Sequence, residues 1–117
     1  MGVYIKVDED KVTFVATDAH KMVKYTYLDI HSDMEGVMII PRKSLSLLSL
    51  ALEGDDNAIL NYSNSHVFIQ LGETEIACRL IDATFPNYNA VIPTNNPNIL
   101  TIDRKALLNS LKRISIY

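Results

Sequence analysis

Apolar and polar side chains alternate along the first part of the chain, in the period-two pattern of strands that bury one face. Apolar side chains occupy every second position in residues 3–7 and again in residues 12–16, with the acidic segment 8–10 between them. This pattern predicts a hairpin over residues 3–17. Residues 22–28 are rich in β-branched and aromatic side chains, which favour a third strand.

A continuous apolar run and then a helical spacing follow. Residues 37–40 are all apolar, which is typical of a strand covered on both faces. Pro41 fits the first turn of a helix, where a missing N–H has no effect on the hydrogen bonding. From Leu45 onward, leucines recur at i, i+3 and i+7 and so share one helical face. We predict a helix over residues 42–53 that ends at Gly54.

Three more short segments have strand composition and are separated by turn-forming residues. They predict strands at residues 58–62, 66–71 and 75–80. Residues 81–91 contain the sequence Phe-Pro-Asn-Tyr and are too irregular for a helix or a central strand. Two prolines and three asparagines in residues 93–98 then predict a linker.

The last twenty residues have a pattern of their own. Residues 99–102 are strand-like, and Asp103 is the expected N-cap of a helix that continues almost to the end of the sequence. Leu107, Leu111 and Ile114 form its apolar stripe. Taken with the earlier segments, this predicts an α+β chain of antiparallel sheets with seven or eight strands and two helices.

Composition fits this picture, and the distribution of charge adds to it. The 117 residues are 48% hydrophobic and carry a net charge of −3, which excludes a globally basic nucleic-acid-binding protein but not a basic patch on one face. Residues 1–97 carry 7 basic and 13 acidic side chains, whereas residues 98–117 carry 4 basic and 1 acidic. The change of sign at the linker indicates a junction between two structural units.

Several kinds of chemistry lack the residues they need. Cys78 is the single cysteine, so an intramolecular disulfide is excluded and a zinc site cannot be built on cysteines. The four glycines are scattered and form no phosphate-binding loop. No apolar run approaches the ~20 residues of a membrane span. We therefore expect a cytoplasmic protein with no metal, no cofactor and no membrane partner.

Asp18 and His20 are the only evident acid–base pair. Side chains at i and i+2 of a strand point to the same face, which permits a carboxylate–imidazole contact. The sequence offers no nucleophile elbow and no third metal ligand beside them. A turn-stabilising aspartate and a hydrogen-bonded histidine are therefore the favoured interpretation, and we predict no catalytic residues.

Two connecting segments, residues 17–22 and 85–91, carry apolar side chains that could meet. If these segments lie close together, they form an apolar cleft suited to an extended peptide with hydrophobic anchors. Its members would be Met22, Pro86 and Val91, rimmed by His20 and Lys21. The alternative, equally compatible with the spacing, is that the apolar residues only close the end of the core.

Three segments resemble the bacterial DNA sliding clamp, the beta subunit of DNA polymerase III. Residues 15–22 (VATDAHKM), 40–43 (IPRK) and 80–88 (LIDATFPNY) are similar to the family patterns VATDGHRL, VPRK and DGRFPDY, in the same order and at compatible spacing. The resemblance implies that residues 1–97 match the middle clamp domain without its first strand and helix. Residues 98–117 would match the opening strand and helix of the third domain, so the sequence would be a fragment.

The resemblance also implies a function. The family forms a homodimeric ring around duplex DNA and tethers the polymerase III catalytic subunit, the clamp loader and repair factors, without catalysing a reaction itself. Basic residues on helices that line the ring would face the DNA phosphates, which makes binding salt-dependent and blind to sequence. In this sequence, the resemblance assigns contact with the DNA phosphates to Arg42, Lys43, Lys105 and Lys112.

The peptide-binding pocket of the family coincides with the cleft inferred above. It carries over to Thr17, Ala19, His20, Lys21, Met22, Pro86 and Val91. Ala19 replaces a family glycine, so a left-handed backbone becomes less favourable there. Lys21 and Met22 replace an arginine and a leucine, and methionine still supplies a pliable apolar wall.

Two other functions remain open at this point, together with one question of assembly. The chain could be a β-rich peptide-binding module that never meets DNA, or a small hydrolase that uses Asp18 and His20. Under the clamp interpretation the missing opening helix leaves apolar surface and a sheet edge uncovered. We expect residues 99–117 to cover such a surface, either in the same chain or by crossing to a second copy.

Overall fold

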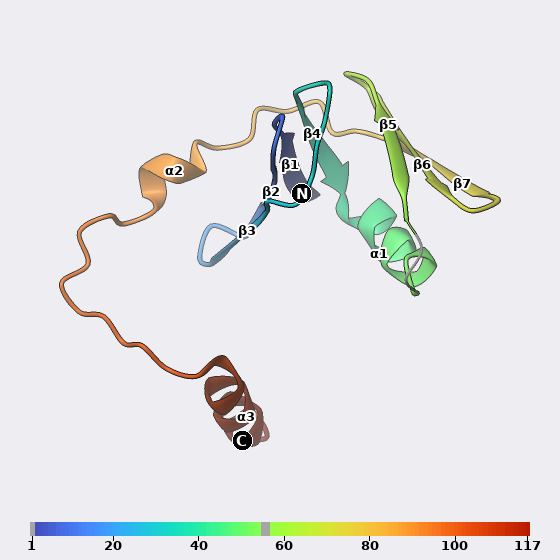
Figure 1. Cartoon of the computed structure of the whole chain (residues 1–117). Helices are drawn as coiled ribbons and strands as arrows, with labels where there is room; N and C mark the ends of the chain where they lie inside the picture. The colour runs from blue at the N-terminus through green and yellow to red at the C-terminus, as the bar shows by residue number, and fades with distance from the viewer. Residues whose placement is uncertain (1, 55–56) are drawn as a thin grey trace. The chain divides into compact units, whose positions relative to one another are not determined.

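The computed structural model describes residues 2–54 and 57–117 and divides them into two compact units. The first unit ends at Phe85 and contains all the strands, and the second comprises Pro86–Tyr117. Figure 1 shows the order of the elements along the chain. The division falls before the predicted linker, because residues 86–91 belong to the second unit.

The first unit begins with an antiparallel sheet of four strands in the order β3-β2-β1-β4. The strands are β1 (Gly2–Val7), β2 (Val12–Thr17), β3 (Met22–Tyr27) and β4 (Gly36–Pro41). In the register of this sheet, Ile5 lies opposite Phe14 of β2 and opposite Met38 of β4. The predicted hairpin and third strand are confirmed. Of the continuous apolar run, Met38, Ile39 and Ile40 are buried as predicted, whereas Val37 is 57% exposed.

A helix and a second sheet complete this unit. The helix α1 (Arg42–Ala51) starts directly after β4, and Figure 1 shows it leading from the four-stranded sheet to the three-stranded one. The second sheet is antiparallel in the order β5-β6-β7, with β5 (Ile59–Tyr62), β6 (His66–Leu71) and β7 (Thr74–Arg79). After β7, the Ile81 N–H donates to the Ile39 carbonyl oxygen at 3.0 Å and ties the chain back to β4.

One hydrophobic core joins the two sheets and α1. The four-stranded sheet contributes alternate residues of its inner face, α1 contributes Leu48, and the second sheet with the residue that follows it contributes the rest. The buried members are Ile5, Val12, Met38, Ile40, Leu48, Val67, Ile69, Cys78 and Leu80. The inward residues are spaced by two in the strands, so the alternation seen in the sequence sets this core.

The second unit consists of two helices and an irregular connection. It holds α2 (Tyr88–Val91) and α3 (Arg104–Ile114). The Asp103 side chain accepts a hydrogen bond from the Ala106 N–H at 2.8 Å, which confirms the predicted N-cap. No helix in the described part of the chain combines the length and the apolar character that crossing a membrane requires.

Two predictions about this unit are wrong. Residues 88–91 form the short helix α2 and raise the number of helices among the described residues from two to three. Residues 99–102 are irregular rather than a strand. A strand needs a neighbour to pair its backbone groups, and the other described elements of this unit are helices.

Candidate functional site

The turn between β2 and β3 is held by its own side chains. Asp18 Oδ1 accepts hydrogen bonds from the backbone N–H groups of His20 and Lys21, both at 2.9 Å. The Thr17 hydroxyl donates to the Lys21 carbonyl oxygen at 2.9 Å and accepts from the Ala19 N–H at 3.1 Å. Asp and Thr are typical of such turns because their short side chains reach the backbone two to four residues away. These hydrogen bonds within residues 17–21 therefore define the shape of the turn.

This turn gives Ala19 an unusual backbone conformation. Its φ is 74°, in the left-handed region, so the prediction that alanine in place of the family glycine argues against a left-handed backbone at this position is wrong. A left-handed backbone costs a residue with a Cβ about 1–2 kcal/mol. The Thr17 and Asp18 side chains accept hydrogen bonds from the backbone N–H groups of Ala19, His20 and Lys21, and these bonds hold Ala19 there despite that cost.

The charges of this turn pair locally. The Lys21 ammonium forms an ion pair with Asp18 Oδ2, and Lys21 is the main reason that the pKa of Asp18 lies below its ordinary value of 3.8. The backbone N–H groups of Lys21 and His20 lower the pKa further. The Asp18 carboxylate thus binds the backbone of the turn and the Lys21 ammonium. These contacts support the turn-stabilising interpretation over an acid–base pair with His20.

The predicted pocket residues of the first unit form one exposed rim. Thr17, Ala19, His20 and Lys21 are exposed, and Met22 at the start of β3 is half-buried. Lys21 keeps 84% of its side chain exposed despite its ion pair, so it remains accessible to a ligand.

The other two predicted pocket residues lie in the second unit. Pro86 is its first residue, and Val91 is the last residue of α2, with 67% of its surface exposed. Each half of the predicted pocket is therefore accessible within its own unit. That the two halves form one pocket stays a prediction.

The chain leading to Pro86 is anchored by a contact that the sequence does not reveal. The ring of Phe85, the last residue of the first unit, stacks on the ring of Tyr4 in β1, with 4.9 Å between ring centroids and 24° between their planes. This fixes where the chain leaves the four-stranded sheet. No spacing rule connects residues so far apart, so only the folded structure identifies Tyr4 as a positioning residue.

The predicted DNA-facing residues of α1 lie at its first turn. Arg42 and Lys43 are exposed, and the first turn carries no acidic residue to balance them. Positive charge at a helix N-terminus is unfavourable by a few tenths of a kcal/mol up to about 1. Leu48 of the same helix enters the core, whereas Arg42 and Lys43 are exposed to solvent.

The predicted DNA-facing residues of α3 are exposed, like those of α1. Lys105 and Lys112 are exposed and lie seven residues apart, which places them on one side of the helix. Lys112 and Arg113 occupy the last turn, where positive charge is favoured by the helix dipole.

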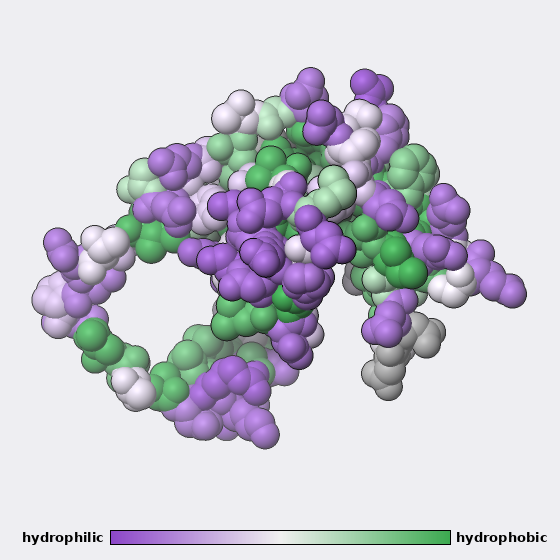
Figure 2. Space-filling model, turned by 45° about the horizontal axis from the view of Figure 1, so that its top comes forward, coloured by the Kyte–Doolittle hydropathy of each residue, from purple (hydrophilic) through white to green (hydrophobic). Residues whose placement is uncertain are grey.

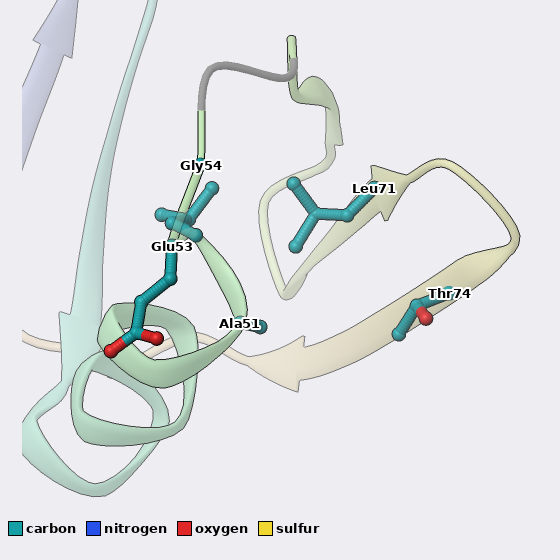
Figure 3. Close-up of a pocket in the computed structure, with 6 residues that line it drawn as sticks. Ala51, Glu53, Gly54, Leu71 and Thr74 are labelled. Carbon is teal, nitrogen blue, oxygen red and sulfur yellow. The ribbon is translucent and has the colours of Figure 1, made fainter.

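The first unit also contains cavities away from these residues. One of about 170 Å³ lies between the end of α1 and the β6–β7 hairpin and is lined by Ala51, Leu52, Glu53, Gly54, Leu71 and Thr74 (Figure 3). A wider hollow at the β1–β2 turn is lined mainly by acidic side chains, including Glu9 and Glu35. In the part of the chain that the structure describes, no three His, Cys, Asp or Glu side chains are grouped so that they could hold a metal ion.

Comparison with known proteins gives a consistent result. The sequence model of the family "DNA polymerase III beta subunit, central domain" matches residues 1–87. The chain is 32% identical over 120 residues to the beta sliding clamp of Synechococcus elongatus, covering 98% of this chain and 32% of that protein. It is 28% identical over 118 residues to the beta sliding clamp of Borreliella burgdorferi, covering 99% of this chain and 30% of that protein.

Solved structures agree with the sequence comparison. A sliding clamp (DNA polymerase III subunit beta) from Pseudomonas aeruginosa, bound to griselimycin, superimposes with a TM-score of 0.81 at 28% identity. The match covers 98% of this chain and 32% of that one. A putative DNA polymerase III beta subunit from Eubacterium rectale, at 18% identity, shares the fold with a TM-score of 0.85. The chain thus spans about a third of the length of the curated relatives it matches.

Proposed function

The chain belongs to the central-domain family of the DNA polymerase III beta subunit, and from this premise we propose that it serves as part of a DNA polymerase processivity clamp. In the whole protein this part would help to encircle duplex DNA and to tether replication proteins to it, in the cytoplasm and without catalysing a reaction. The observation that carries the proposal is the family match over residues 1–87, which includes the turn, β4 and α1 described above.

The domain assignment is part of the proposal. Residues 1–97 would correspond to the middle clamp domain and residues 98–117 to the opening of the third. The change from 13 acidic and 7 basic side chains to 1 acidic and 4 basic ones supports a junction near residue 97. The helix α3 with its Asp103 cap supports an independent element beyond that junction.

For DNA, the proposal assigns Arg42 and Lys43 on α1 and Lys105 and Lys112 on α3 to phosphate contacts. All four are exposed, and α1 keeps two cations at its N-terminus against the preference of the helix dipole. The rest of the first unit is acidic, so it would repel DNA and leave the helices as the attractive surface. Phosphate contacts carry no sequence information, which suits a ring that slides.

For proteins, the proposal assigns Thr17, Ala19, His20, Lys21, Met22, Pro86 and Val91 to a pocket for short peptides. Its partners would be the polymerase III catalytic subunit and the clamp loader. The turn at Asp18, which is held by its own hydrogen bonds, favours this role, since a rim that is ordered before binding loses little entropy when a peptide docks.

The DNA assignment is tested in a homodimeric ring in which the chain replaces the matching third of the Synechococcus elongatus clamp. The ring is loaded on nicked circular DNA, and its retention is measured as salt rises. We expect Arg42→Glu with Lys43→Glu to shorten retention at least about tenfold at low salt, because two phosphate contacts become repulsive.

A matched control carries the same change of charge elsewhere. Lys11→Glu with Arg79→Glu reverses two exposed cations outside α1, one in the turn between β1 and β2 and one at the end of β7, and should leave retention within about twofold. Equal losses in the two double variants would mean that net charge alone controls retention. Unchanged retention in the α1 variant would refute the assignment of Arg42 and Lys43.

A further inference from the structure

The four-stranded sheet also buries residues on its outer face, which lies opposite the core. Tyr4 neighbours the core residue Ile5 in β1, so it points to this outer face. Val15 of β2 and Ile39 of β4 lie directly across from Tyr4 and complete a row of three. Val15 is 0% exposed and Ile39 5%, although neither belongs to the core that joins the two sheets. The row therefore marks a second, smaller packing surface on the sheet.

The segment that follows β7 runs to this surface and is attached in three places. The Leu80 N–H donates to the Ser65 carbonyl oxygen at 2.8 Å, and the Ile81 N–H donates to a carbonyl oxygen of β4 at 3.0 Å. Figure 1 shows the chain leading from β7 back past β4 and β1. The Phe85 ring then stacks on the Tyr4 ring, with 4.9 Å between the ring centroids. The hydrogen bonds thus fix the start of the segment, and the ring stack fixes its end.

Two residues of the proposed peptide pocket lie on the same outer face. Thr17 and Met22 lie opposite each other in β2 and β3, and Thr17 is two residues from Val15 along β2. Tyr4 is therefore a diagonal neighbour of Thr17, at a spacing of about 7–8 Å that aromatic side chains can bridge. Figure 2 shows several hydrophobic patches among hydrophilic residues on the surface, so hydrophobicity alone does not single out this place. The register of the strands does.

Pro86, which the proposed function places in the peptide pocket, follows Phe85 directly. We propose that Tyr4 is a positioning residue of this pocket: its stack on Phe85 holds Pro86 beside the exposed rim of the first unit. This inference rests on the proposed function and adds a residue outside the seven assigned to the pocket. When Pro86 is held in place before a peptide arrives, less conformational entropy is lost on binding, and the affinity is higher for that reason.

The test measures the affinity of the chimeric ring for a fluorescent clamp-binding peptide of the polymerase III catalytic subunit. Tyr4→Leu should weaken binding about three- to tenfold, because it removes the ring stack and keeps an apolar side chain. Tyr4→Phe retains the ring and should bind within about twofold of the wild type. Phe68→Leu is the matched control, since it removes a ring stacked on His66 in the second sheet, and it should change the affinity less than about twofold.

A double-mutant cycle shows whether Tyr4 acts through Phe85. Phe85→Leu alone should weaken peptide binding as much as Tyr4→Leu does, because either substitution removes the whole stack. The double variant should then lose no more affinity than either single variant. If Tyr4→Leu prevents folding, Phe85→Leu still decides, since Phe85 lies outside the strands. Additive losses would show that the two rings act independently and would overturn the proposal.

Two further measurements separate positioning from folding and from failure of the pocket itself. Retention of the Tyr4→Leu ring on DNA should stay within about twofold of the wild type, because the proposed phosphate contacts come from α1 and α3. Equal losses of retention and peptide affinity would indicate a purely structural role and overturn the proposal. If Met22→Asp weakens peptide binding and Tyr4→Leu does not, only the positioning role is overturned. If neither variant weakens binding, the pocket assignment is overturned together with it.

Discussion

The Tyr62 hydroxyl donates a hydrogen bond to the Met34 carbonyl oxygen at 3.1 Å, across 28 residues of sequence. Tyr62 is the last residue of β5, and Met34 lies just before β4, so the bond joins the three-stranded sheet to the four-stranded one. The ring lies over Gly36, where a Cβ would come within 2.7 Å of Tyr62 Cε2. One side chain thus fixes how β5 meets the start of β4.

We expect Tyr62→Phe to lower the free energy of unfolding by about 1 kcal/mol, because it removes this hydrogen bond while keeping the ring. Urea denaturation measures the change. Tyr88→Phe is not a suitable control, since Tyr88 has interactions of its own, so Tyr117→Phe at the fully exposed C-terminus serves instead. A Tyr62→Phe protein as stable as the wild type would show that the bond to Met34 adds nothing.

Gly36→Ala should destabilise the first unit by about 1–3 kcal/mol, because the new methyl group forces the Tyr62 ring to move. The double variant with Tyr62→Leu tests this cause, since the smaller side chain makes room for the methyl group. We expect the double variant to lose less than the sum of the two single losses. Strict additivity in urea denaturation would contradict the steric explanation.

Ala19→Gly should stabilise the protein by up to about 1 kcal/mol, because glycine adopts a φ of 74° without the cost that a Cβ brings. Ala16→Gly in β2 is the matched control and should destabilise, since Ala16 has an ordinary strand conformation. Thermal unfolding of both variants gives the comparison. A loss of stability in Ala19→Gly would mean that the turn does not strain its alanine.

The pKa of Asp18 should rise toward 3.8 when Lys21→Met removes the ammonium. A pKa lowered on folding stabilises the turn above pH 3.8, and this contribution disappears as the pH falls through the lowered pKa. NMR titration of the Asp18 carboxyl carbon measures the pKa directly. The Lys11→Met variant removes an equal charge outside the turn, so an equal rise there would assign the effect to net charge.

Met22→Asp should weaken peptide binding at least about tenfold in the chimeric ring, because it places a charge on the proposed apolar wall. Fluorescence polarisation with a clamp-binding peptide of the polymerase III catalytic subunit measures the affinity. Val91→Asp tests the half of the pocket in the second unit, and Leu50→Asp, exposed on α1, serves as the control. If only Met22→Asp weakens binding, the pocket does not include α2.

The sequence was sufficient for features that depend on neighbours along the chain. Alternation located the strands, the spacing of leucines located α1, and Asp103 marked the start of α3, because each pattern follows directly from the geometry of one element. The three clamp-like segments also lie in the sequence itself, and the family match agrees with them. The sequence did not predict the short helix α2, since a single helical turn is too short to show a hydrophobic periodicity.

Tertiary structure decided what depends on distant residues and on competing local forces. The stacking of Tyr4 on Phe85 and the bond from Tyr62 to Met34 join residues that no spacing rule relates. The left-handed Ala19 reflects hydrogen bonds that outweigh the preference of the residue. Local preferences amount to about 1 kcal/mol per residue, so packing and hydrogen bonds of similar size can reverse them at individual positions.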